Sequence, residues 1–244
     1  MAHEYYAADL PGKVMYKKQF GVSIRRITPI EQKYILSLSQ KQQRTNEDYI
    51  NFLKKLVVFD NPEMTFEELF WFDVQYLLYR IRFTTWPKFP IKLTFNCDNE
   101  ECGKEVTVPL EMGNLEISEA SDIENLSSGI HLENLGDSYI RQKTIGDDIA
   151  IDKLLKAKNF DVDDPQMRLL ALDLCLISNG KSLEEMWNLA DDGTITAADI
   201  TMVEEWFTKT VWGVKEEIVV KCPNCGKESS RGYMLALEDF FSAY

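Results

Sequence analysis

Apolar positions with helical spacing dominate two stretches of the chain, and short runs typical of strands lie around them. We expect an extended arm over residues 1–12 and two short strands within Val14–Ile27. A first helix starts at Thr28, whose hydroxyl can cap it, with Pro29 at the first helical position. This helix is expected to run to about Gln42.

Two more helices are predicted before residue 90. Asn46 can cap the first of them. The second opens at a capping box in which Thr65 is answered by Glu68, and Trp86–Pro87 ends it. Apolar residues surround this helix on nearly all sides: Leu69, Phe70, Phe72, Val74, Tyr76, Leu77 and Ile81. Such a helix is expected at the centre of the molecule or in a subunit interface.

The second half of the chain places a helical section between two strand pairs. The first pair is Ile91–Phe95 with Val106–Leu110, and the second is Glu217–Lys221 with Ser230–Leu237. Between them we expect a polar loop with short strand pieces (Glu116–Gly136), a strand within Tyr139–Ile145 and helices from about Asp147 to Thr210. The helix signals are Asp164–Pro165, Ser182 with Glu185, and Thr196 with Asp199 at the starts, and Gly180 and Gly193 at the ends. An amphipathic turn, Leu237–Tyr244, closes the chain.

Four of the five cysteines lie in the turns of the two strand pairs, in closely similar stretches. Cys97 and Cys102 are separated by four residues, Cys222 and Cys225 by two, and each second cysteine begins a Cys-Gly-Lys-Glu sequence. Such tight turns let two sulfurs of one chain reach adjacent corners of a tetrahedron, about 2.3 Å from a metal. The glycine permits a left-handed backbone that points amide N–H groups at the sulfurs, and such donors stabilise thiolates.

We therefore predict that Cys97, Cys102, Cys222 and Cys225 form one Zn2+ site. The site is structural, because four thiolates leave no position for a catalytic water. The 119 residues between Cys102 and Cys222 would be inserted into a discontinuous zinc ribbon, with their two ends brought together by the metal. The alternatives are reduced, unliganded thiols, or disulfides if the protein works outside a cell. A thioredoxin-like redox pair would need a βαβ context, which Cys222 lacks.

The other residues that could form functional sites are expected to have structural roles. Cys175 lies in an apolar helical run and is expected to be a buried core residue rather than a reactive thiol. Asn188–Asp199 partly matches an EF-hand loop, but Ala190 occupies a ligand position, which favours a helix, an Asp-Gly turn and a capped helix over a calcium site. With only His3 and His131, a His-dependent triad or two-His metal site is nearly excluded. Phosphate-loop, dinucleotide and Gly-x-Ser-x-Gly motifs are absent, so we expect no enzyme.

Composition narrows the functional classes. The 244 residues, 45% of them apolar, suffice for one large or two small domains with a sizeable core. The net charge of -13 repels phosphate backbones and argues against broad nucleic-acid binding. No apolar run approaches the ~20 residues that span a bilayer, and the N-terminus lacks a signal-peptide core. We expect the protein to work, or to be assembled, in a reducing cytoplasm, where cysteines indicate metal ligands or buried thiols.

The expected fold class is α+β: a discontinuous zinc ribbon with β-hairpins, plus N-terminal and inserted helical segments. The segments are an N-terminal arm with strands (1–28), a helical segment (29–90), the first half of the ribbon (91–112), a loop with the inserted helical domain (113–214), and the second half of the ribbon with the tail (215–244).

Two features allow for partner contacts. Lys17-Lys18 and Arg25-Arg26 make the N-terminal region locally basic, either as a solvated strand face or as a docking patch for an acidic neighbour. The 28 aromatic residues exceed the needs of a small core. Some of them are therefore expected to face partners.

The layout resembles that of T4-type bacteriophage baseplate proteins, in particular the hub or wedge-associated subunits of contractile tails. The most distinctive residues of this layout are Phe95–Cys97, Cys102–Glu105 and Lys221–Lys227, which identify the ribbon module. The resemblance to the family rests on the length of the chain and on the order of its segments. The resemblance implies a non-enzymatic, structural virion protein of the tail baseplate, assembled in the host cytoplasm. Its partners would be other baseplate and tail proteins, and not nucleic acid, a membrane or a small-molecule substrate.

Two other functional classes stay open. A cytosolic zinc-ribbon adaptor in transcription or replication would need a basic or aromatic nucleic-acid face, which the charge of -13 disfavours. Such an adaptor would shift DNA in electrophoresis. An enzyme with an unrecognised site would show turnover.

Overall fold

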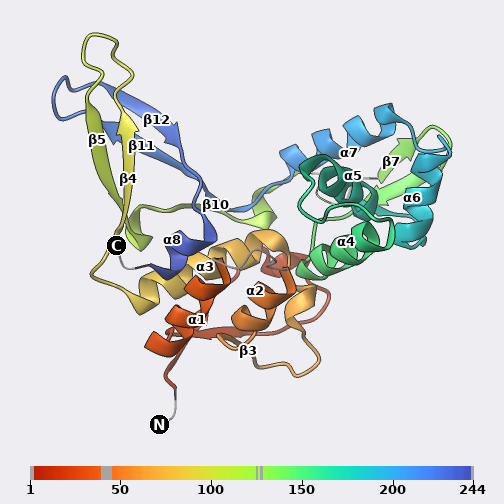
Figure 1. Ribbon diagram of the computed structural model, residues 1–244, viewed down its shortest axis with the longest axis horizontal. Helices are drawn as coiled ribbons and strands as arrows, with labels where there is room; N and C mark the ends of the chain where they lie inside the picture. Colours follow the sequence, from red (N-terminus) through yellow and green to blue (C-terminus); the bar gives the residue numbers. More distant parts are fainter. Residues whose placement is uncertain (1–2, 40–45, 125, 127–128, 243–244) are drawn as a thin grey trace.

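The computed structural model describes residues 3–39, 46–124, 126 and 129–242, which form a body, two projecting hairpins and a helical module (Figure 1). The strands are β1 (Tyr5–Ala8), β2 (Val22–Arg25), β3 (Val57–Phe59), β4 (Ile91–Asn96), β5 (Glu105–Leu110), β6 (Glu116–Ser118), β7 (Gly129–Leu132), β8 (Gly136–Ile140), β9 (Ile177–Ser178), β10 (Gly213–Lys215), β11 (Glu217–Lys221) and β12 (Glu228–Gly232). The α-helices are α1 (Pro29–Ser39), α2 (Asn46–Leu53), α3 (Trp71–Thr85), α4 (Ile145–Ala157), α5 (Pro165–Leu176), α6 (Leu183–Asp191), α7 (Ala197–Lys209) and α8 (Leu237–Phe241). Helices with several small antiparallel sheets confirm the α+β class. None of the helices in the described part of the chain is long and apolar enough to cross a membrane.

The body is built around α3. Ten of its fifteen residues are buried, and α1, α2, α8 and the antiparallel sheet β1-β2-β3 surround it (Figure 1). The C-terminal α8 returns to this core, where the Phe240 ring meets Tyr79 edge-on at 4.8 Å between centroids. Phe241 meets Phe52 in the same way at 5.4 Å. The predicted central position of the most apolar helix is therefore confirmed.

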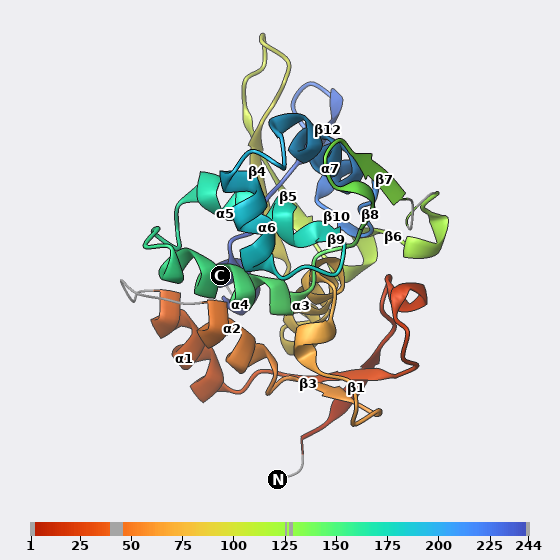
Figure 2. The ribbon, with the colours of Figure 1, turned by 90° about the vertical axis from the view of Figure 1, so that its right-hand side faces the viewer.

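Two β-hairpins, β4–β5 and β11–β12, project together from the body (Figures 1 and 2). Each is a separate two-stranded antiparallel sheet. Val106 and Val220 are buried between them, with partly buried Phe95, Val108 and Ile218 around them. Apolar packing and side-chain contacts, rather than a shared ladder of backbone hydrogen bonds, thus join the two hairpins.

The helical module consists of α4 to α7 and the antiparallel sheet β7-β8-β9 (Figure 2). Its buried apolar residues form a cluster separate from that of the body: Leu132, Ile140, Ile151, Leu154, Leu155, Ala171, Leu174, Leu176, Ile177, Met186, Trp187, Ile195, Val203 and Trp206. The module therefore has a hydrophobic core of its own.

The predicted helix starts of the module are confirmed. Asp164 Oδ1 accepts hydrogen bonds from two amides of the first turn of α5. Ser182 with Glu185 and Thr196 with Asp199 form reciprocal capping boxes on α6 and α7. These short-range contacts satisfy amide groups that a helix start leaves without partners, which is why local sequence specifies them.

A two-stranded neck and the start of α4 join the module to the body, since Ile145 of α4 belongs to the core of the body and its amide donates to the Leu69 carbonyl at 2.9 Å. β6 leads towards the module and β10 leads back, and they pair antiparallel with Gly213 opposite Ser118. Gly213 has φ 90°, and a Cβ there would lie 3.1 Å from the Phe72 carbonyl oxygen. The ends of the insertion are thus held together by strand pairing, and not only by the cysteines as the sequence suggested.

A buried carboxylate fixes this neck against α3. Asp73 is completely buried and accepts hydrogen bonds from Gly12 N at 2.8 Å, Tyr16 Oη at 2.6 Å and Trp212 Nε1 at 3.1 Å. Burial raises the pKa of Asp73, and the three donors oppose that rise. One side chain therefore ties the N-terminal segment and the residue preceding β10 to the central helix.

The N-terminal expectations need correction. Residues of the predicted arm form β1, which pairs with β2, and Val14–Ile27 contains one strand rather than two. Lys13–Met15 is instead a 3-10 helix. The expectation failed because Asp73 holds this segment through a contact across 61 residues, which no local pattern records. The expected end of α1 at Gln42 and the expected cap of Asn46 lie outside the described residues and side chains.

Three further boundaries are shifted. The capping box of Thr65 and Glu68 opens the 3-10 helix Phe66–Glu68, and α3 begins only after it. β8 ends at Ile140, before the predicted strand end, because Thr144 caps α4. β12 ends at Gly232 and not at Leu237.

Two of the four basic N-terminal residues form ion pairs within the molecule, whereas Lys17 and Arg26 are exposed. Lys18 forms an ion pair with Glu68 at 2.7 Å, and the buried Arg25 pairs with Glu31 at 2.6 Å. Hydrogen bonding to Arg25 lowers the pKa of Glu31 to about 2. Pairing within the chain thus reduces the basic patch to Lys17 and Arg26, and docking of an acidic neighbour there stays a prediction.

Replacing Asp73 with alanine is expected to lower the free energy of unfolding by about 3 kcal/mol or more, because three buried donors lose their acceptor at about 1–3 kcal/mol each. Urea unfolding measures it. As a control, Asp9→Ala removes an exposed carboxylate paired with Lys13 and should change stability by less than about 1 kcal/mol. Similar losses in both variants would contradict the role given to Asp73.

A second prediction concerns the buried Asp173 of α5, whose Oδ2 accepts no hydrogen bond from the described residues. Burial, and then the charge of Glu204, raise its pKa from 3.8 to about 7. The folded state therefore binds this proton more tightly than the unfolded state. Its contribution to stability is complete below about pH 4 and is lost as the pH rises through about 7.

Asp173→Asn should accordingly gain stability relative to the wild type between about pH 5 and pH 8. Urea unfolding at both pH values measures the difference. The exposed Asp163→Asn, in the same module, controls for removal of one negative charge. A stability difference for Asp173→Asn that stays constant with pH would count against the explanation.

Candidate metal centre

Two similar turns at the tips of the hairpins carry the four cysteines. Cys97 directly follows β4, and Cys222 directly follows β11. In each turn the amide of the first cysteine donates to the carbonyl of the lysine in Cys-Gly-Lys, Cys97 to Lys104 and Cys222 to Lys227, both at 2.9 Å. Turns of different length therefore close with the same backbone pairing.

The glycine in each turn is required by its backbone conformation. Gly103 has φ 53° and Gly226 has φ 75°, in the left-handed region that side chains disfavour. A Cβ at either position would meet nothing within 4 Å, so the constraint is conformational and not steric crowding. The predicted left-handed turns are confirmed.

The four sulfur atoms converge. Sγ of Cys97 lies 3.6 Å from that of Cys225, Sγ of Cys102 lies 3.8 Å from that of Cys222, and all four lie within 4.8 Å of one another. Disulfide sulfurs would be about 2.05 Å apart, so these thiols are not bonded to each other. Sulfurs at tetrahedral corners about 2.3 Å from an ion would lie about 3.8 Å apart. The four cysteines are therefore placed to hold one metal ion.

The electrostatics of the cluster favour a cation. The amides of Cys225 and Asn224 lower the pKa of the Cys222 thiol to about 6. The pKa of Cys97 is raised to about 11: the Asn99 amide lowers it, but burial and the neighbouring thiols outweigh that effect. Sulfurs this close cannot all ionise without a compensating positive charge, which a divalent ion supplies.

Contacts between the two turns involve residues that sequence analysis did not single out. Lys104 Nζ donates to Asn224 Oδ1 at 3.4 Å, and Lys227 Nζ donates to the Asp98 carbonyl at 3.1 Å. Arg231 of β12 also forms an ion pair with Asp98. The repeated Cys-Gly-Lys sequence marks the two lysines. It does not show that the partner of each lysine lies on the opposite hairpin.

Cys175 lies apart from the cluster. Its Sγ donates to Asp147 Oδ1 at 3.2 Å and accepts from Arg141 Nη2 at 3.3 Å. Burial raises its pKa to about 12, so the thiol form is strongly favoured. The expected unreactive thiol is thus partly buried beside an ion pair, and not within an apolar core.

The partial calcium motif serves helix capping. Asp192 Oδ1 accepts from Thr194 N at 2.9 Å. Asp199 accepts from Thr196 N at 2.9 Å and from Glu133 N at 3.1 Å. These carboxylates complete the turn between α6 and α7, as the structural interpretation predicted.

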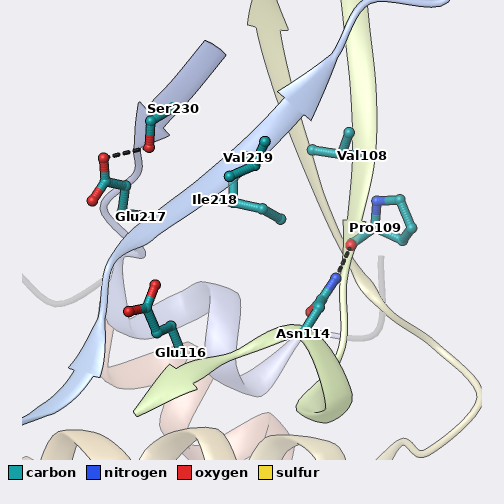
Figure 3. A pocket seen from close by; sticks show the side chains of 8 residues that line it. All are labelled: Val108, Pro109, Asn114, Glu116, Glu217, Ile218, Val219 and Ser230. Carbon is teal, nitrogen blue, oxygen red and sulfur yellow. Dashed lines mark hydrogen bonds between the residues drawn. The ribbon is translucent and has the colours of Figure 1, made fainter. Parts of the chain in front are cut away.

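A pocket lies between β5 and β11, near the body end of the hairpins (Figure 3). Its polar groups are bonded to each other or to neighbours: Asn114 Nδ2 donates to the Pro109 carbonyl at 2.9 Å, and Ser230 Oγ donates to Glu217. Val108 and Ile218 line it between these groups (Figure 3). The pocket marks where the hairpins diverge, and its polar groups are engaged in structural contacts.

A protein-family model described as T4 bacteriophage base plate protein matches residues 6–242. Comparisons with curated proteins and with solved structures give no match. The family match spans the body, both hairpins and the helical module, which is nearly the whole chain. The chain therefore belongs to the T4 bacteriophage base plate protein family.

Proposed function

We propose that this protein is a structural component of a phage contractile-tail baseplate, that it acts in assembly through protein–protein contacts, and that its four clustered cysteines bind one structural Zn2+. The family match over residues 6–242 carries the baseplate role. Its partners are then other baseplate and tail proteins, and its place is the tail baseplate of the virion, after assembly in the host cytoplasm. The alternative is a DNA-binding adaptor, which the net charge of -13 disfavours.

The donor set supports zinc. Four thiolates in tetrahedral arrangement are typical of Zn2+ or iron–sulfur sites, and the distances of 3.6 and 3.8 Å suit a single ion of Zn–S geometry. All four positions of such an ion are taken by protein. The metal would therefore hold residues 91–112 and 215–244 together as one ribbon and would perform no chemistry.

The hairpins have particular need of a metal. Their shared core contains only Val106, Val220 and Cys222 as buried members among the described residues. Ile91, Leu93 and Leu110 anchor the base of β4 and β5 in the larger core of the body, so it is the outer part of the hairpins that depends on this small core. The body and the helical module have larger cores, so the proposed metal would act mainly on the hairpin tips.

Freshly purified protein should contain about one Zn2+ per chain. Elemental analysis measures the content, and Co2+ substitution reports tetrahedral thiolate ligation through its absorption spectrum. Cys222→Ser should reduce metal binding, whereas Cys175→Ser, which changes the cysteine outside the cluster, should leave it intact. Metal-free protein with four reactive thiols would contradict a metal site, and iron would contradict zinc.

Cys222→Ser should also impair assembly. It weakens a site whose binding energy, on the order of 10 kcal/mol, is part of the folding energy of the ribbon. Because the module core contains no hairpin residue, helical circular dichroism should be largely kept while the hairpins lose order.

Complementation of a phage that lacks this protein measures the result. Cys222→Ser should give few contractile tails and unassembled baseplate intermediates, and Cys175→Ser should complement normally. Normal yields of infectious particles from a variant shown to have lost its zinc would mean that the metal is dispensable for assembly.

A further inference from the structure

The helical module carries an apolar groove of about 670 Å³ between α5, α6 and α7. Eight of its twelve lining residues are apolar. Met167 and Leu170 of α5 and Ile200 of α7 are partly exposed on its walls, and Trp187 of α6 is nearly buried. Neither the cysteine cluster nor the neck uses this surface.

One wall of the groove is an exposed aromatic ring on a fixed backbone. Asn159 has φ 61°, and the amides of Asn159 and Phe160 donate to the carbonyls of Lys156 and Leu155. This is the hydrogen-bond pattern of a Schellman motif, which ends α4 rigidly. Phe160 is 41% exposed and lies against Trp187, at 5.7 Å between ring centroids. A ring held in this way loses little freedom on binding a partner.

The charge around the groove is strongly negative. Residues 160–209 contain eleven acidic and three basic residues, a net charge of -8 out of -13 for the chain. Arg168 forms an ion pair with Asp152 at 2.5 Å, and Lys209 forms one with Glu205 at 3.3 Å. Among the described residues, no ion pair involves Asp191 or Glu204, the two acids of the groove.

Two acidic side chains, Asp191 and Glu204, line the groove itself. The charge of Glu204 acts on the buried Asp173, whose Oδ2 accepts no hydrogen bond from the described residues. A cationic group in the groove would meet the carboxylate of Glu204, and Asp191 lines the same groove. An apolar floor with carboxylates beside it suits a ligand that is both apolar and basic.

We propose that this groove binds a positively charged amphipathic helix of a neighbouring baseplate protein. The apolar stripe of that helix packs on Met167, Leu170 and Ile200, and a lysine or arginine lies beside Glu204. α5 and α7, with 12 and 13 residues, are about 18–20 Å long and match three to four turns of a partner helix. A second copy of this chain is the wrong occupant, because it would bring the same acidic module.

This inference names the partner chemistry of the proposed assembly role and rests on it. The test uses full-length, metal-loaded protein and an 18-residue helical peptide with a leucine stripe flanked by lysines. Two matched peptides replace either the lysines with glutamate or the leucines with serine. The lysine–leucine peptide should bind, and each matched peptide should bind about tenfold or more weakly. NMR shifts of the Trp187 indole should locate the binding.

Charge reversals on α7 provide the matched variants. Glu204 lines the groove and Glu205 does not, so Glu204→Lys should weaken peptide binding about tenfold and Glu205→Lys less than about twofold. Ala197→Trp, which fills the groove, should also weaken binding. Equal effects of the two reversals, or equal binding of the serine peptide, would show diffuse charge attraction and overturn the proposal. Peptide binding requires no phage assembly, so its failure is distinguishable from failure of the baseplate role.

Discussion

The buried carboxylate of Asp73 is the contact on which the arrangement of the other parts depends. Its three donors come from the N-terminal segment, at Gly12 and Tyr16, and from Trp212, the residue immediately before β10. The hydrogen bond to Trp212 therefore sets where the chain re-enters the body after the helical module. From that point β10 pairs with β6, and β11 is led to its place beside β5. The two cysteine turns meet because a polar contact far from them fixes the path of the strands. That contact persists only because all three donors bind one acceptor away from water.

This arrangement changes the role that a metal would have. The sequence alone suggested that the metal closes an insertion of 119 residues. In the structure, the pairing of β6 with β10 and the Trp212 contact already bring the two ends of the insertion together. These contacts, and not the metal, therefore offset most of the entropy cost of closing the loop. A metal at the cysteines would then act at the far end of the hairpins, where Val106 and Val220 are the buried residues that accompany Cys222 in the described part of the shared core. Its effect would be to fix the hairpin tips as a rigid projection.

The features that the sequence predicted well are those specified within a few residues. The capping boxes at Ser182 and Thr196, the hairpin strands and the two Cys-Gly-Lys turns are of this kind, since each satisfies its own hydrogen bonds or ligand spacing locally. The features that it missed depend on contacts between distant segments. The 3-10 helix near Gly12 forms because Asp73 holds it, and the lysines of the two Cys-Gly-Lys turns find partners on the opposite hairpin. The convergence of the four sulfur atoms could be predicted because identical short motifs imply a common ligand. No sequence motif marks Asp73, so its contacts could not be predicted.

The distribution of charge connects stability with assembly. Most of the net negative charge is on the helical module, away from the hairpins, so the two projecting parts offer neighbours chemically different surfaces. In the free subunit, burial raises the pKa of Asp173, and repulsion by the Glu204 charge raises it further. That repulsion is a cost to the folded monomer at neutral pH. The proposed basic partner would remove it on binding, because its cation would lie beside these carboxylates. The same acids would then steer the module towards cationic neighbours and away from other copies of itself.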